Sequence, residues 1–187
     1  PMQTIQEQLK TGELSRVHLL YGEEQYMVRY YKNLLKEKLS QPDDTMNVAS
    51  FYGSQTSPSE IDDVAQILPF LAPNRLILVE SSGFFKNASD MADYIAKFPE
   101  TTYVVFLEQE VDKRNRLYKW VNKNGCVTEC KKQSVSMLSK WVAGYLKRAD
   151  KKITVEAVQT LLERVGTDME TLTGELEKLI GYTGDRG

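Results

Sequence analysis

The feature that most limits the fold of this chain is the near-continuous apolar run at 75–80 (RLILVE). A strand with one face in water alternates apolar and polar residues, whereas a strand of a parallel sheet covered on both faces is apolar almost throughout. The run therefore predicts a central strand of such a sheet. Four further strands of the same sheet are expected at 16–21, 47–52, 101–107 and 126–130.

Helical patterns separate these strands. Helices are expected over 26–39, 58–68, 91–98 and 116–121. The second of these has a strong start signal at 57–60 (SPSE), because a serine that can cap the helix precedes a proline at the first helical position and a glutamate at the third. Strands that alternate with helices predict an α/β domain, a parallel five-stranded sheet with helices on both faces.

The pattern changes after Gln133. Helices are expected to start near 134, 154 and 167, and no strand is expected after residue 133. The last helix begins at 167–170 (TDME), which predicts a capping box that uses Glu170. We therefore expect an α/β domain over 1–133 and a small all-α domain over 134–187.

Composition excludes several classes of protein. The 187 residues include 24 Lys and Arg against 26 Asp and Glu, so a strongly basic nucleic-acid-binding coat is excluded. No apolar run approaches the ~18 residues that span a bilayer, so no membrane partner and a cytoplasmic location are expected. Cys126 and Cys130 are expected to be buried, reduced thiols, because their spacing lacks the second pair of a zinc site. No metal site is expected.

The turn after the first strand is the place to look for a nucleotide site. A phosphate-binding loop needs several glycines, a lysine and a hydroxyl residue. This turn has one glycine, Gly22, and then Glu23 and Glu24, which either repel phosphate or simply complement the helix dipole. The only histidine, His18, is expected to be a satisfied core residue. No cofactor and no catalytic residue are therefore assigned.

Two charged groups of residues carry less specific signals. A basic cluster is a solvated face or a contact with DNA or another subunit, and the sequence leaves both open. Its members are Lys113, Arg114, Arg116 and Lys119. The carboxylate pairs at 43–44 and 62–63 are expected to be plain surface charge.

An apolar segment lies where a polar loop is normal. Leu68, Phe70 and Leu71 lie at and just after the C-terminus of the second expected helix, in a segment that Pro69 and Pro73 stiffen. On a stiffened loop, apolar side chains can fill a partner's pocket at low ordering cost. The alternative is that they cover the edge of the sheet, and the residues alone leave both possibilities open.

Several short motifs occur in an order that extends from Val17 to Tyr182. They are 19–24 (LLYGEE), 68–70 (LPF), 74–76 (NRL), 112–119 (DKRNRLYK), 161–166 (LLERVG) and 175–179 (ELEKL). In these the chain resembles the delta subunits of the bacterial DNA polymerase III clamp loader. The resemblance implies an AAA+-like domain without a functional phosphate loop, followed by a helical lid domain. Family members are longer and end in a collar domain that holds the pentamer together, and no such domain is expected within these 187 residues.

The resemblance also implies a function. Delta subunits bind the sliding clamp (beta) and open it, in a complex with gamma or tau and delta prime subunits that meets primed DNA. By position, Leu68, Phe70 and Leu71 would enter the clamp pocket, although Pro69 departs from the family pattern. The family has lost ATP binding, and Glu170 stands where an ATP-using relative carries a phosphate-sensing arginine. No catalytic activity of its own is expected. An active AAA+ ATPase and a stand-alone DNA-binding domain remain the alternatives.

Overall fold

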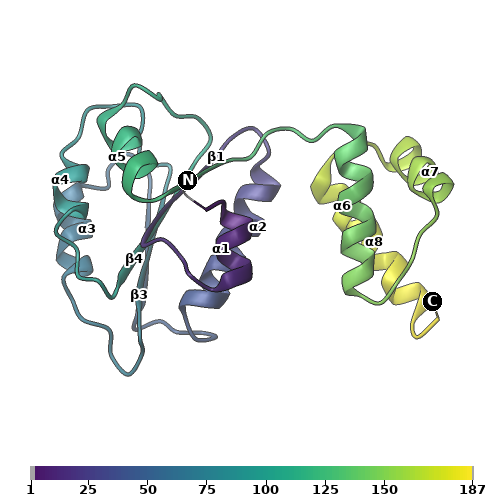
Figure 1. Ribbon diagram of the computed structural model, residues 1–187, viewed down its shortest axis with the longest axis horizontal. Coiled ribbons are helices and arrows are strands. Elements are labelled where there is room, and N and C mark those ends of the chain that lie inside the picture. Colours follow the sequence, from purple (N-terminus) through teal and green to yellow (C-terminus); the bar gives the residue numbers. More distant parts are fainter. Residues whose placement is uncertain (1–2, 187) are drawn as a thin grey trace. The chain divides into compact units, whose positions relative to one another are not determined.

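A computed structural model describes residues 3–186 (Figure 1). The chain forms two compact units that divide between Lys131 and Lys132. In the first unit, strands and helices alternate: α1 (Ile5–Thr11), β1 (Val17–Tyr21), α2 (Gln25–Leu39), β2 (Val48–Tyr52), α3 (Pro58–Ala65), β3 (Arg75–Glu80), α4 (Met91–Ile95), β4 (Thr102–Glu108), α5 (Arg116–Asn124) and β5 (Cys126–Glu129).

The strands of the described residues form one five-stranded sheet in the order β2-β3-β4-β1-β5, and every neighbouring pair is parallel. In the register, Leu19 of β1 lies between Phe106 of β4 and Val127 of β5. The expected α/β class with a five-stranded parallel sheet is confirmed. The strongly apolar run at 75–80 is β3, and all its residues except Glu80 are buried.

Helices cover both faces of this sheet, as Figure 1 shows. Successive side chains of a strand point to opposite faces, so Leu19 and Leu20 enter different cores. Leu19 packs in the core that α3, α4 and α5 cover, and Leu20 packs in the core that α1 and α2 cover. This covering on both sides is the physical reason for the apolar strands.

One helix lies outside the expected set. Helix α1 is short and mostly polar, and it begins with a capping box in which Thr4 Oγ1 accepts from the Glu7 amide and Glu7 Oε2 accepts from the Thr4 amide. Its single fully buried apolar side chain is Ile5, which joins the core under α2. One buried apolar residue is too few to show a helical period, although the capping pair was a usable signal.

Helix α3 is shorter than expected. Its capping box at Ser57 and Glu60 is present, but the helix ends at Ala65 and leaves Leu68 outside it. The proline at 69 disfavours helical backbone at the residue before it, so the apparent continuation of the period to Leu68 is wrong. Helix α4 likewise ends at Ile95 instead of 98.

The second unit contains α6 (Val135–Arg148), α7 (Val155–Val165) and α8 (Met169–Thr183), which pack against one another. Ser134, Thr154 and Asp168 cap the three helices. Strands are absent from the part of this unit that the structure describes. Across residues 3–186, no helix is both long enough and apolar enough to cross a bilayer.

Candidate functional site

The apolar segment after α3 forms an exposed loop. The exposed fraction is 67% for Leu68, 56% for Phe70 and 89% for Leu71. Ile67, next to them, is also more than half exposed. These side chains therefore do not cover the edge of the sheet. Several exposed apolar side chains next to one another are unusual on a protein surface, which makes this loop a candidate site.

The backbone of this loop is held in place although its side chains are exposed. The Phe70 amide donates to Asn47 Oδ1 at 2.7 Å, and Asn47 Nδ2 donates to the Phe70 carbonyl at 2.9 Å. Leu71 has a positive φ of 52°, which a residue with a side chain adopts only when its surroundings hold it. The loop thus presents its apolar side chains from a fixed backbone.

The turn after β1 is closed by the chain itself. The Glu24 amide donates to the Cys130 carbonyl at 3.0 Å, and the Cys130 amide donates to the Tyr21 carbonyl at 2.6 Å. A Cβ placed on Gly22 would lie 2.2 Å from the Cys130 carbonyl oxygen. The Glu24 amide, which a bound phosphate would need, therefore already has an acceptor, and the segment at Cys130 occupies the space above Gly22.

The side chains around this turn also oppose phosphate binding. Glu24 caps α2, and its Oε1 accepts from the Tyr26 amide at 3.3 Å, while Glu23 is exposed. Gln25 Nε2 donates to the Gly22 carbonyl at 2.6 Å. Residues 22–25 include no lysine or arginine, so the two glutamates make this turn negatively charged.

The predicted role of Glu170 needs correction. Asp168, and not Thr167, caps α8: its Oδ2 accepts from the Thr171 amide at 2.9 Å and from the Thr171 hydroxyl at 2.6 Å. The helix therefore starts one residue later than expected, and Glu170 is not the partner in a capping box. Aspartate is a better cap than threonine, which explains the shift. Glu170 lies in the first turn of α8, where its negative charge interacts favourably with the helix dipole.

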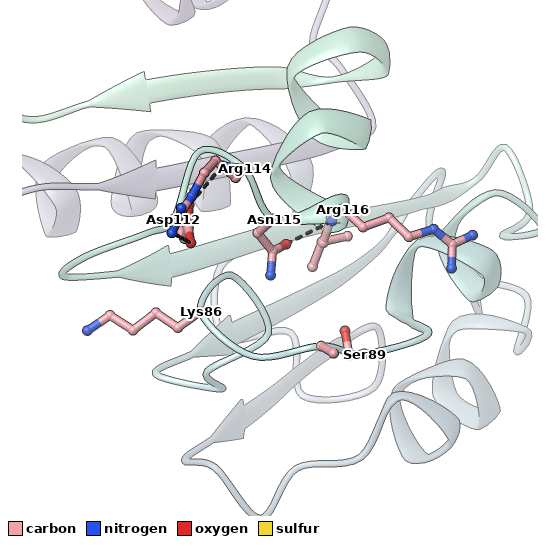
Figure 2. A pocket seen from close by; sticks show the side chains of 8 residues that line it. Lys86, Ser89, Asp112, Arg114, Asn115 and Arg116 are labelled. Atoms are coloured by element: carbon pink, nitrogen blue, oxygen red, sulfur yellow. Dashed lines mark hydrogen bonds and ion pairs between the residues drawn. The ribbon is translucent and has the colours of Figure 1, made fainter.

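The basic cluster is largely neutralised by carboxylates. Arg114 donates to Asp112 through Nε at 3.1 Å and Nη2 at 2.9 Å, and Arg116 Nη1 donates to Asp93 at 3.1 Å. Asp112, Arg114 and Arg116 line a pocket of about 610 Å³. In Figure 2, Arg114 folds onto Asp112, while Lys86 and Arg116 extend in opposite directions.

The other two cations of this cluster also lie near carboxylates. Lys113 Nζ lies 3.7 Å from Glu129 Oε2. Hydrogen bonds from Arg114 are the main reason why the pKa of Asp112 falls to about 2, and the charge of Lys119 adds to the effect. A phosphate backbone would have to displace these partners. These ion pairs are solvent-exposed and therefore weak, so a contact of this cluster with DNA or another subunit stays a prediction.

His18 is fully buried in β1. Neither ring nitrogen has a hydrogen-bond partner among the described residues, so the expectation of a satisfied core histidine is wrong in that respect. Burial lowers the pKa of His18 to about 4, and a contact with the Ser15 backbone, which falls outside hydrogen-bond geometry, opposes the shift. The neutral ring is an inert part of the core, not a base in an accessible site.

Cys126 and Cys130 are buried free thiols, as expected. Burial raises the pKa of Cys130 to about 12, with smaller contributions from the charges of Glu24 and Glu129. Such a thiol is unreactive at neutral pH. Over residues 3–186, no three His, Cys, Asp or Glu side chains gather as a metal site would require.

Sequence reasoning missed the residues that hold these two places in shape. The pattern places Asn47 in a strand and Cys130 in a strand with a buried thiol, and it does not predict that Asn47 fixes the exposed loop or that Cys130 closes the turn. Both act through hydrogen bonds to distant backbone, which leave no periodic pattern. A polar side chain among apolar neighbours, as at Asn47, was the one available signal.

Comparisons with known proteins point to one family. The family model described as "DNA polymerase III, delta subunit" matches residues 18–131, more than half of the chain. A curated relative, DNA polymerase III subunit delta of Bacillus subtilis, is 25% identical over 191 residues, which cover 95% of this chain and 55% of the relative. The chain thus spans little more than half the length of this relative.

Solved structures show the same architecture. The Bacillus subtilis DNA clamp loader delta protein matches with a TM-score of 0.80 and 22% identity, over 97% of this chain and 57% of that protein. A DNA polymerase III gamma subunit-related protein of Thermotoga maritima matches with a TM-score of 0.53 and 14% identity, over 94% and 58%. A RuvB variant of the same organism matches at 0.50 and 12%, over 91% and 56%. The fold is AAA+-like, and by its family match the chain belongs to the delta subunits of DNA polymerase III.

Proposed function

We propose that this chain is the clamp-binding part of a clamp loader, and that it docks its exposed apolar loop into a hydrophobic pocket on a sliding clamp. The observation that carries the proposal is the exposure of Leu68, Phe70 and Leu71 on a loop whose backbone is already fixed. Membership in the delta family supplies the class of partner.

Opening of the clamp follows from differential binding. A ligand shifts an equilibrium between two states only by the difference in its affinity for them. If the loop fits the open ring better than the closed ring, binding alone favours opening, and no hydrolysis by this chain is needed. The closed turn at Gly22 supports a binding role over the ATPase alternative, because it offers no free phosphate cradle.

The wider complex is proposed on the same grounds. The partners would be the beta clamp, the gamma or tau subunits and delta prime, with primed DNA met only within the assembly. The carboxylates paired with Arg114 and Arg116 weigh against a stand-alone DNA-binding domain. In this role the chain has no catalytic activity of its own and acts in replication through its contacts.

The test is a direct binding measurement with a sliding clamp. Phe70→Ala is expected to weaken binding by at least about 30-fold, which corresponds to ~2 kcal/mol, the loss typical of a central interface residue. Its stability should change little, because Phe70 is more than half exposed. Surface plasmon resonance with immobilised clamp gives the affinity, and denaturant unfolding gives the stability.

The matched control is Tyr52→Ala. Tyr52 is an aromatic residue of similar exposure, but it lies in β2 at the opposite end of the strand from the loop. Its removal should leave clamp affinity unchanged. Equal binding by wild type and Phe70→Ala would refute the proposal, and unfolding of Phe70→Ala would show that the side chain belongs to the core.

A further inference from the structure

Two buried polar side chains lie directly beneath the exposed loop. Asn47 is 4% exposed and Arg75 is 5% exposed, although both carry polar side chains. Buried polar groups are costly unless their hydrogen bonds are made, so the partners of these two side chains indicate what they do. Most of those partners are backbone atoms of the 67–71 loop or of the segment before β2.

Asn47 binds the middle of the loop through both atoms of its amide. Its Oδ1 accepts from the Phe70 amide and its Nδ2 donates to the Phe70 carbonyl, so the side chain imitates a neighbouring strand. The same Nδ2 donates to Asp44 Oδ2 at 3.0 Å. Asn47 thereby fixes the backbone of the residue proposed to carry most of the binding.

Arg75 binds the start of the loop through its guanidinium. Nε donates to the Ile67 carbonyl at 2.6 Å, Nη2 donates to the Leu68 carbonyl at 3.4 Å, and Nη1 donates to the Met46 carbonyl at 3.3 Å. One rigid, planar group thus joins the loop to the segment before β2. A lysine has a single nitrogen and could not span the three carbonyls.

Asp44 completes the arrangement and corrects the expectation of plain surface charge. Its Oδ1 accepts from the amides of Met46 and Asn47, both at 2.9 Å. These hydrogen bonds from Asn47, with a smaller effect of the Arg75 charge, lower the pKa of Asp44. The carboxylate orients the Asn47 amide, which leaves its other atoms aimed at Phe70.

From these contacts we propose that Asn47 and Arg75 are positioning residues that hold the 67–71 loop in its docking conformation before the clamp arrives. This inference rests on the proposed function, because it names how that same site is prepared. A loop that is already ordered loses less conformational entropy on binding and so binds more tightly. The positive φ of Leu71, whose side chain is 89% exposed, shows that backbone contacts and not side-chain packing set the loop's shape.

The first experiment measures order in the loop. The Phe70 amide lies in a loop with exposed side chains, yet it should exchange slowly with deuterium because it donates to buried Asn47 Oδ1. Asn47→Leu has a side chain of similar size but removes both hydrogen bonds to the Phe70 backbone. Hydrogen exchange at the Phe70 amide should therefore accelerate at least about tenfold. The matched control is Gln8→Leu, which removes a buried amide that bonds instead to Gln3 and Ser15.

The second experiment measures clamp affinity for the same variants. Asn47→Leu is expected to bind the clamp about tenfold more weakly than wild type, although the docking side chains of the loop are not substituted. Gln8→Leu should bind the clamp as wild type does, even if its stability falls by the same amount. Arg75→Lys provides a second variant if Asn47→Leu does not fold. This variant keeps the positive charge but loses the planar guanidinium that contacts three carbonyls. It should show both faster hydrogen exchange at the Phe70 amide and weaker clamp binding.

The outcomes separate this inference from the function on which it rests. If Phe70→Ala weakens clamp binding but Asn47→Leu and Arg75→Lys bind as wild type, the positioning role is wrong and the docking function stands. If Gln8→Leu weakens binding as much as Asn47→Leu, the effect is general stability and the inference also fails. If Phe70→Ala itself has no effect, the proposed function is wrong whatever the exchange data show.

Discussion

At the scale of single residues, Gly22 is the position where an added Cβ would clash most closely with the rest of the chain. Its φ is +133°, and the Cys130 carbonyl oxygen occupies the position that a side chain would need. Glycine is thus required twice, for the backbone conformation and for the close approach of another segment. Gly22 therefore allows the turn after β1 to pack against the segment that follows β5.

Gly22→Ala is therefore expected to destabilise the protein by about 3 kcal/mol or more, since strain and a clash add. Gly12→Ala is the matched control, because Gly12 also has a positive φ, of 82°, but has open space around it. It should cost only about 1 kcal/mol, for the left-handed conformation alone. Urea unfolding of both variants measures the difference, and equal losses would show that the turn is not closed.

His18 makes stability depend on pH. Its pKa is about 4 in the folded state against an ordinary value of 6.5, so below pH 6.5 the unfolded chain binds a proton that the folded chain does not. Stability from this residue is complete above pH 6.5 and is lost as the pH falls through 4, by up to about 3 kcal/mol.

The measurement compares wild type with His18→Leu between pH 7 and pH 4. Wild type should lose more stability over this range, because only it carries the buried imidazole. Glu108, whose pKa is raised by burial, acts in the opposite direction but is present in both proteins and cancels. Parallel stability curves for the two proteins would contradict the assignment.

At the scale of elements, α3 sets the position of the exposed loop. The capping box at Ser57 and Glu60 fixes where the helix starts, and Pro69 ensures that it has ended before the loop. Thr102 Oγ1 of β4 donates to the Ala65 carbonyl at 2.7 Å, which ties the last turn of the helix to the sheet. The loop therefore leaves the domain from a fixed point.

Ser57→Ala should destabilise the first unit by about 1 kcal/mol, because the Glu60 amide loses its acceptor. Ser57→Asp keeps a capping oxygen and should be close to wild type in stability. Thermal unfolding followed by circular dichroism measures both variants. An unchanged midpoint for Ser57→Ala would mean that the box does not stabilise α3.

At the scale of the whole molecule, the residues proposed for docking all belong to one compact unit. The loop, Asn47 and Arg75 lie in the unit that ends at Lys131, which also contains two apolar cores of its own. A unit with complete cores on both faces of a sheet can fold independently.

A fragment of residues 1–131 is therefore expected to fold and to bind the clamp within about threefold of the whole chain, since no docking contact is removed. Circular dichroism and surface plasmon resonance test the two parts of this statement. An unfolded fragment would show that the division between Lys131 and Lys132 is not a domain boundary. A folded fragment that fails to bind would place part of the docking surface in residues 132–187.

The sheet, most helices and the position of the apolar loop could be predicted from the amino-acid sequence. These features depend on neighbouring residues: apolar runs such as 75–80 reflect burial on both faces, and caps such as Ser57 act within one turn. Tertiary structure decided whether the loop was exposed, what closed the turn at Gly22 and what held Phe70. Those outcomes rest on bonds between distant segments, which a sequence pattern does not record because it reports only what is close along the chain.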